Sequence, residues 1–390
     1  MEPTSGEYNF TRLESVIFGA GKIEKLGYEL ERRGARRALI VTGKTLGASK
    51  LLEAVKQAAG PAIAGVFAGA QQHSPSKTVD ALAAEARGVE ADALISFGGG
   101  SPIDTAKAAA MAILGGRAAT RSARREGDAA GAATRELLHI AIPTTLSAAE
   151  FTPGGGVTDE ATREKGGVWD PRLQPRVVIL DPELTVATPA WLWASTGMRA
   201  LDHAVEAAYS SRRQIITDAL AAKAIALLVA HLKPSLQGGA GEIEHRVQCQ
   251  YAAWLSIFGA MNTRLGISHA LGHQIGPYWD VPHGYTSCIT MPHVMRFMAN
   301  IAPERFGAIA EGFGVRFDPD NPRLAALECA DRTAKFIGQF EVPTRLRDVN
   351  VPHEELSRVA GTVLAELERA RSVGANVTVE SLVTLLEAAY

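Results

Sequence analysis

Runs of β-branched and aliphatic residues alternate with longer helical stretches through the first half of this 390-residue chain and then stop. Five runs read as strands, at 38–42, 61–67, 93–97, 138–142 and 176–180. Segments with helical periodicity separate the early runs, at 21–33, 46–59 and 76–88. Strand and helix in alternation build a parallel sheet covered by helices. The first half is therefore predicted to be an α/β domain.

From about Pro189 onward, Ala- and Leu-rich segments with helical periodicity replace these runs. They cover 190–210, 215–232, 241–262, 303–314, 321–340 and 352–371. A chain of this length exceeds the size at which a single core keeps growing, so two domains are expected. We predict an α/β domain over residues 1–185 and an all-helical domain over residues 186–390.

Composition excludes several classes of protein. The formal net charge of −2 and pI near 6.6 give no reason to expect a nucleic-acid partner or a strongly anionic surface partner. Three widely spaced cysteines form neither a disulfide framework nor a CxxC metal motif. The N-terminus lacks the features of a signal peptide, and no apolar run reaches the ~18 residues of a membrane span. We expect a cytoplasmic protein with reduced thiols and no membrane partner.

A glycine-rich turn follows the predicted strand at 93–97. Gly98, Gly99, Gly100 and Ser101 precede Pro102, which suits the first turn of a helix. The amides at a helix N-terminus favour a phosphate or pyrophosphate, so we predict phosphate binding here, the alternative being a flexible bend. The Arg-rich segment 115–133 is instead predicted to be a mobile surface loop rather than a second phosphate site.

The end of an early strand usually carries the acidic residue that holds the 2′-hydroxyl of an adenosine ribose. Here the strand at 38–42 is followed by Gly43 and Lys44, with no carboxylate. Gly43 leaves room for a 2′-phosphate and Lys44 can pair with it, so NADP is at least tolerated. The alternative is that Lys44 is only a solvated loop residue.

Histidines are concentrated in one stretch of the second half. His269 and His273 are four residues apart, which places them on one helical face, and His283 follows in a Pro-His-Gly sequence interpreted as a loop. This grouping is typical of a metal site or a proton-transfer site. The alternative is one capping and two core histidines, but a further histidine, His203, favours the site.

Together these motifs resemble those of a known family over nearly the whole chain. The segments that carry the resemblance are 18–21, 98–104 with Lys107, 142–150, 170–172, 181–182, 197–206 and 269–283. The chain is similar to the iron-containing (group III) alcohol dehydrogenase superfamily, and within it to the maleylacetate reductase-like branch.

The resemblance implies a dehydroquinate synthase-like fold, with an N-terminal nucleotide-binding domain, a C-terminal helical domain and catalysis in the cleft between them. It implies NAD(H) or NADP(H) on the glycine turn, near Asp104, Thr144 and Thr145, and a homodimer. Metal-dependent members hold iron or zinc with one Asp and three His. The histidines match His203, His269 and His283, and His273 matches an active-site histidine near the nicotinamide.

The fourth implied ligand departs from the pattern. The family's Asp lies four residues before the first His, and here Arg199 occupies that position. A guanidinium cannot coordinate a cation and repels it. Asp202 is three residues away, and we predict that it pairs with Arg199. The maleylacetate reductase-like branch similarly lacks the Asp and works without a metal.

We therefore predict an enzyme that reduces a small carbonyl substrate, an oxo-acid such as maleylacetate or else an aldehyde or ketone, by hydride transfer without a metal. His273 is the predicted proton donor. Arg199 either stabilises the developing oxyanion or binds a substrate carboxylate. His203, His269 and His283 either bind a weak zinc in a three-His site or hydrogen-bond the substrate. The alternatives are a metal-dependent (Fe or Zn) alcohol dehydrogenase, a dehydroquinate synthase-like lyase and a non-catalytic cofactor-binding protein.

Overall fold

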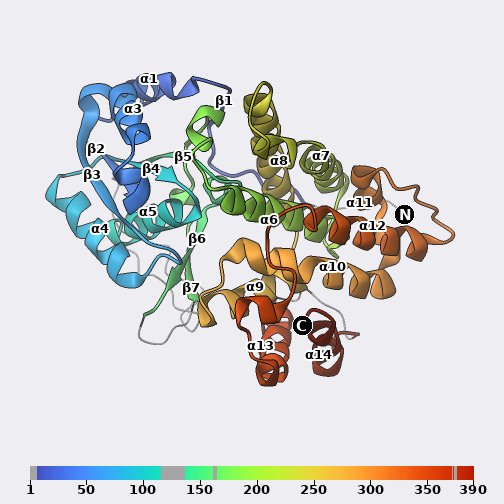
Figure 1. The fold of residues 1–390 in the computed structure, drawn as a ribbon. Helices are drawn as coiled ribbons and strands as arrows, with labels where there is room; N and C mark the ends of the chain where they lie inside the picture. Colours follow the sequence, from blue (N-terminus) through green and yellow to red (C-terminus); the bar gives the residue numbers. More distant parts are fainter. Residues whose placement is uncertain (1–6, 116–136, 161–164, 371, 373–375) are drawn as a thin grey trace. The chain divides into compact units, whose positions relative to one another are not determined.

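The computed structural model describes residues 7–115, 137–160, 165–370, 372 and 376–390. They form two compact units, which Figure 1 colours from blue to green and from green to red. The first unit is Phe10–Thr188, and the second is Pro189–Tyr390 together with residues 7–9. The Arg-rich segment that we predicted to be a mobile loop lies, beyond Gly115, outside the described residues.

The first unit is built on a six-stranded parallel sheet, as predicted. Its spatial order is β1-β8-β5-β4-β2-β3. The strands are β1 (Ser15–Phe18), β2 (Ala38–Gly43), β3 (Ile63–Ala70), β4 (Ala93–Gly98), β5 (Leu138–Pro143) and β8 (Val177–Leu180). The predicted strands include all of these except β1, an edge strand whose four residues are only partly buried and so form no continuous apolar run.

Alternate residues of the central strands enter two separate hydrophobic cores. Leu39, Val41 and Leu94 pack against helices α4 (Ser76–Gly88) and α5 (Gly100–Ile113). Ile40 and Ile95 point the other way, toward α1 (Leu26–Arg32) and α3 (Lys50–Ala59). Because the sheet is covered on both faces, its strands are near-continuous apolar runs, which is why the sequence revealed them.

An antiparallel hairpin of β6 (Gly154–Thr158) and β7 (Lys165–Trp169) was not predicted. Helix α5 holds it in place, since Asp104 Oδ2 accepts a hydrogen bond from the Gly156 amide at 3.0 Å. Lys107 is fully buried, and its Nζ donates to the carbonyl oxygens of Ala149 (2.5 Å) and Gly154 (2.8 Å) and to the Thr152 hydroxyl (3.1 Å). Burial lowers the pKa of Lys107 to about 8.

The second unit contains helices and no strand among its described residues, in agreement with the prediction. Its helices are α6 (Ala190–Tyr209), α7 (Ile215–His231), α8 (Glu242–Ala260), α9 (Ile267–Tyr278), α10 (His283–Ile301), α11 (Gly307–Phe313), α12 (Pro322–Ile337), α13 (Leu356–Ala370) and α14 (Val379–Ala388). Helix α6 is central, because it packs against α7, α8 and α10 and is buried from Met198 to Tyr209. None of the described helices is long and apolar enough to cross a membrane.

Residues 7–9 belong with the helical unit, although sequence analysis assigned the N-terminus to the α/β domain. The Tyr8 hydroxyl donates to the Phe258 carbonyl at 3.1 Å, and the Asn262 side-chain amide donates to the Asn9 carbonyl at 3.1 Å. These bonds tie the segment to the end of α8, a pairing across about 250 residues that local patterns do not reveal.

A buried histidine on β5 makes the stability of the first unit depend on pH. His139 Nε2 lies 2.8 Å from the Ser96 hydroxyl, and burial, together with the charge of Lys107, lowers the pKa of His139 to about 3. In the unfolded chain His139 becomes protonated near its ordinary pKa of 6.5, whereas in the folded chain it stays neutral until the pH is much lower. Stability is therefore lost as the pH falls from 6.5 toward 3.

We predict that His139 contributes a loss of up to about 1.4 kcal/mol per pH unit in this range. His139→Gln should flatten the dependence of the unfolding free energy on pH, measured by urea denaturation at several pH values. His353→Gln, which replaces an exposed histidine, serves as the control. Equal slopes for wild type and His139→Gln would contradict the prediction.

Candidate functional site

The glycine turn in the first unit joins β4 to the N-terminus of α5. Gly98 has a φ of 141°, and a Cβ there would lie 3.0 Å from Pro102 Cγ. A Cβ on Gly99 would lie 3.1 Å from Thr145 Cγ2, and one on Gly100 would lie 3.3 Å from Ser147 Oγ. The turn thus requires small residues because the segment after β5 packs directly against it.

Two hydroxyl groups beside this turn suit an anionic ligand. Thr145 Oγ1 and Ser147 Oγ are buried and have no hydrogen-bond partner among the described residues. They face a 14-residue helix whose first amides carry the positive end of the helix dipole. Unpaired buried hydroxyls next to helix amides fit the oxygens of a pyrophosphate, so the residues present fit NAD(P).

The strand order places the other predicted cofactor residues close by. Strand β3 lies on one side of β2 and strand β4 on the other, so the order in which strands are added to the sheet reverses between β2 and β4. Open α/β folds usually bind nucleotides at such a reversal. Gly43 ends β2, and Lys44 begins the short helix α2 (Lys44–Gly47) with an exposed side chain. Thr144 donates its amide to the Gly98 carbonyl at 2.9 Å.

The remaining two predicted cofactor residues lie on α5. Ser101 is half-buried in the first turn, and its carbonyl accepts a bond from the Ser74 hydroxyl at 3.2 Å. Asp104 holds the Gly156 amide, so its demonstrated contact is structural. A cofactor contact of Asp104 stays a prediction.

The four predicted histidines come together in the helical unit. The ring centroids of His203 on α6 and His269 on α9 are 4.9 Å apart. His269 lies 6.4 Å from His273 and 6.5 Å from His283, and the last two rings stack at 5.7 Å. Helix α9 carries His269 and His273, as the spacing predicted.

The prediction that His283 lies in a loop was wrong, because His283 is the first residue of α10. Pro282 precedes the helix in an extended conformation that suits a helix start. Gly284 allows this start to approach α6, since a Cβ there would lie 2.5 Å from the Ser195 carbonyl oxygen. Close packing of α10 on α6 therefore sets the place of His283.

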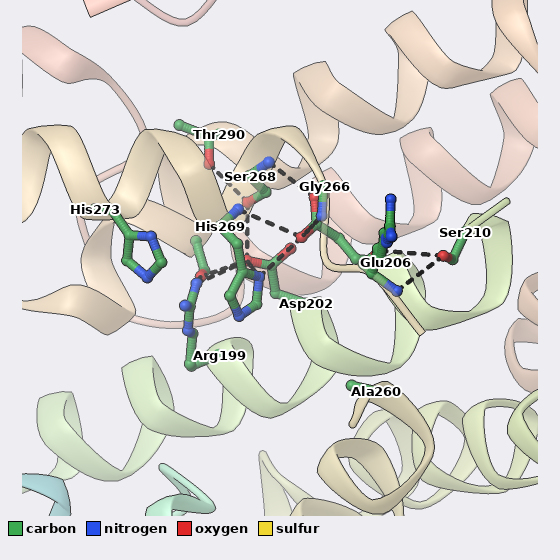
Figure 2. A network of polar contacts seen from close by, with 12 residues as sticks. Arg199, Asp202, Glu206, Ser210, Ala260, Gly266, Ser268, His269, His273 and Thr290 are labelled. Carbon is green, nitrogen blue, oxygen red and sulfur yellow. Dashed lines mark hydrogen bonds and ion pairs between the residues drawn. The ribbon is translucent and has the colours of Figure 1, made fainter. Parts of the chain in front are cut away.

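Arg199 belongs to a buried polar network that is centred on Asp202 (Figure 2). Its Nη1 is 3.3 Å from Asp202 Oδ2 and donates to the Ser287 hydroxyl at 3.2 Å. The same Asp202 oxygen accepts the hydroxyls of Ser268 (2.8 Å) and Ser287 (2.7 Å). The predicted Arg199–Asp202 pair is thus confirmed, and it joins α6, α9 and α10.

Glu206, one turn further along α6, binds the start of α9. Its carboxylate accepts the backbone amides of Gly266 and Ser268, each at 2.8 Å, and lies 2.8 Å from His269 Nδ1. Gly266 provides no side chain to cap α9, so a carboxylate from another helix performs that task. Glu206 lies within the family motif at 197–206, but no local pattern indicates this role.

Burial dominates the electrostatics of this cluster. It raises the pKa of Asp202, and Glu206 adds to the increase, while the guanidinium of Arg199 and the two serine hydroxyls oppose it. Burial, the neighbouring His269 and the charge of Arg199 hold the pKa of His203 well below its ordinary value. His203 is therefore neutral near pH 7, and Arg199 supplies the fixed positive charge.

These residues do not fit the one-Asp, three-His metal site that the resemblance implies. Among the described residues, the group whose possible ligand atoms all lie within 4.8 Å is Asp202, Glu206 and His269, which lacks His203 and His283. The Glu206 carboxylate already accepts backbone amides at the start of α9, and Asp202 Oδ2 already accepts hydrogen bonds from Arg199 and two serines. A dication here would also face the guanidinium.

Glu366 on α13 is a further member of the site that sequence analysis missed. Its Oε1 lies 2.8 Å from His273 Nδ1, and its Oε2 accepts the side-chain amide of Gln274 at 2.8 Å. The two partners are more than 90 residues apart in the chain, and nothing in the local sequence around Glu366 marks it.

Models of known protein families match both units of the chain. The iron-containing alcohol dehydrogenase model matches residues 14–182, and the C-terminal model of the Fe-containing alcohol dehydrogenase family matches residues 193–390. The chain is 33% identical to lactaldehyde reductase of Escherichia coli K12, over 97% of this chain and 98% of that protein. It is 33% identical to maleylacetate reductase 2 of Cupriavidus pinatubonensis, over 77% and 76% of the two chains.

Solved structures similar to this chain come from the same family. The crystal structure of a 1,3-propanediol oxidoreductase has a TM-score of 0.86 and 29% identity, covering 98% of this chain and all of that one. That of maleylacetate reductase from Agrobacterium tumefaciens has a TM-score of 0.80 and 25% identity, covering 100% and 99%. The fold is dehydroquinate synthase-like, and the relatives include the predicted branch. The chain belongs to the iron-containing alcohol dehydrogenase family and is an NAD(P)-dependent oxidoreductase.

Proposed function

We propose that this enzyme reduces the carbonyl group of a small oxo-acid with NAD(P)H, and that Arg199 performs the electrostatic task of the family's metal ion. The observation that carries the proposal is the buried guanidinium of Arg199, one turn before His203 on α6 and close enough for its charge to lower the pKa of His203. Maleylacetate reductases among the relatives support an oxo-acid substrate.

Arg199 retains donors for a substrate. A guanidinium has five N–H groups, and Asp202 and Ser287 take bonds from Nη1 only. Within the part of the chain that the structure describes, no further acceptor binds Arg199. Its fork geometry suits a carboxylate, and its charge also stabilises an oxyanion.

The chain's own residues divide the chemistry among them. NAD(P)H, when bound, supplies a hydride. Arg199 orients the substrate and stabilises the negative charge that develops on the carbonyl oxygen. His273 donates a proton to that oxygen, while His203, which is neutral, and His283 complete the polar lining.

We predict that Arg199→Met raises the KM for an oxo-acid by about 30- to 150-fold, because a charge-assisted bond contributes about 2–3 kcal/mol. Arg199→Lys, which keeps the charge but loses the fork, should give an intermediate KM. The double variant Arg199→Met/Asp202→Asn controls for the carboxylate left unpaired in the core. Steady-state kinetics with an oxo-acid and with a neutral aldehyde test this, and equal losses for both substrates would argue against carboxylate recognition.

We also predict that the purified enzyme contains iron and zinc at well below one ion per chain and keeps its activity in a chelator. The reason is that Arg199 replaces the anionic ligand that a dication requires. Metal analysis and assays with and without chelator are the measurements. Activity that is lost on chelation and restored by added metal would favour a metal-dependent alcohol dehydrogenase instead.

For the cofactor, we propose that Lys44 pairs with the 2′-phosphate of NADPH, since Gly43 provides no carboxylate to repel it. Lys44→Glu should raise the Kd for NADPH on the order of tenfold, about 1.4 kcal/mol, and leave that for NADH nearly unchanged. Fluorescence titration at low salt measures both constants. Lys50→Glu, at an exposed lysine of α3, is the matched control, and an equal change with both cofactors would exclude the pairing.

A further inference from the structure

The contact between His273 and Glu366 is a histidine–carboxylate pair (2.8 Å) held from both sides. Gln274, the residue after His273, donates to the other oxygen of the same carboxylate at 2.8 Å. The Glu366 side chain therefore has one oxygen for each of two adjacent residues of α9. This arrangement fixes the rotation of the carboxylate as well as its distance.

Helix α13 is positioned on α9 by a second contact. The guanidinium of Arg358 lies 4.1 Å from the centroid of the Tyr278 ring and 5.4 Å from that of Trp279. Arg358 and Glu366 are eight residues apart, which places them about 80° from each other around α13, within the broad face that can contact one neighbouring helix. The buried side chains of Val359, Val363 and Leu367 complete the packed face. Glu366 thus reaches His273 from a helix that packs against α9.

The pair adds little to stability. The side chains of His273 and Glu366 are 37% and 19% exposed, and pairs with such access to water contribute little to folding stability. Its larger physical effect is on the ring itself. A carboxylate at Nδ1 keeps the proton on that nitrogen and fixes the ring plane.

We infer that Glu366 is the positioning residue for His273: it holds the Nδ1–H form of the ring, so that proton exchange with the substrate takes place at Nε2. This role rests on the proposed function, in which His273 is the proton donor. Glu366 itself does not touch the substrate.

The proton and electron balance of the step is complete. The carbonyl carbon accepts the hydride, its π electron pair moves onto the oxygen, and the oxygen takes the proton from His273 Nε2. NAD(P)H is oxidised to NAD(P)⁺ in the same step. His273 becomes a neutral imidazole whose Nδ1 keeps its proton and donates it in the hydrogen bond to Glu366, and Nε2 later takes up a new proton from water.

Two variants of the full-length enzyme test the inference. Glu366→Leu removes the acceptor, and Glu366→Gln keeps the shape but removes the charge. Glu368→Gln is the matched control, because it removes an exposed carboxylate from the same helix. Thermal unfolding of each variant shows whether it is folded, and Glu366→Gln remains informative if Glu366→Leu is not.

The first readout does not depend on activity. In protein with ¹⁵N-labelled histidine, the His273 signals are assigned by their loss in His273→Gln. We expect the Nδ1–H form in wild type and in Glu368→Gln, and a shift toward the Nε2–H form in Glu366→Leu. The same form in wild type and both Glu366 variants would overturn the inference, whether or not the enzyme reduces oxo-acids.

The second readout is kinetic. We expect Glu366→Leu to lower kcat about 10- to 100-fold, in the range found for residues that orient a functional histidine. KM and the Kd for NAD(P)H should stay within about threefold, a split that a general loss of structure would not produce. Glu366→Gln should recover part of kcat. A shift of the ring form with unchanged kcat would overturn the catalytic part of the inference and show that His273 is not the proton donor.

Discussion

The helical unit depends on one buried ion pair. Arg199 and Asp202 are three residues apart on α6, yet the serines that share their bonds come from α9 and α10. Removal of one member of a buried pair typically costs about 3–5 kcal/mol, because the other charge is left without a partner in the core. The pair therefore specifies how three helices meet, beyond any net contribution to stability.

Glu206 extends this arrangement by one turn. Arg199, Asp202 and Glu206 follow each other at spacings of three and four, so one face of α6 presents a cation and two carboxylates in a row. The first two hold the network together, and the third holds the amides at the start of α9. Because α9 begins on Glu206, the directions of His269 and His273 follow from α6.

Features that depend on neighbouring residues could be predicted from the sequence. The buried strands of the parallel sheet, the glycine turn and the two histidines on α9 all follow from short-range periodicity or from turn chemistry. The hairpin of β6 and β7 was not predicted because both strands are rich in glycine, which has a low strand propensity.

Other features were hidden because they depend on tertiary contacts. His283 was assigned to a loop since Pro and Gly surround it, whereas Pro282 precedes a helix and Gly284 permits its packing. The contact of Glu366 with His273 links distant parts of the chain, and only the docking of α13 on α9 creates it. The Arg199–Asp202 pair was accessible because both residues lie within one helical turn.

Lys107 shows another way in which this fold uses a buried charge. Its ammonium group binds three oxygens within residues 149–154, the coordination that a structural cation would otherwise provide for such a turn. An ammonium differs from a metal ion in that it loses its charge when it is deprotonated, and the pKa of Lys107 is about 8. The three hydrogen bonds that anchor residues 149–154 should therefore weaken as the pH rises above about 8, because the buried nitrogen of Lys107 loses its charge.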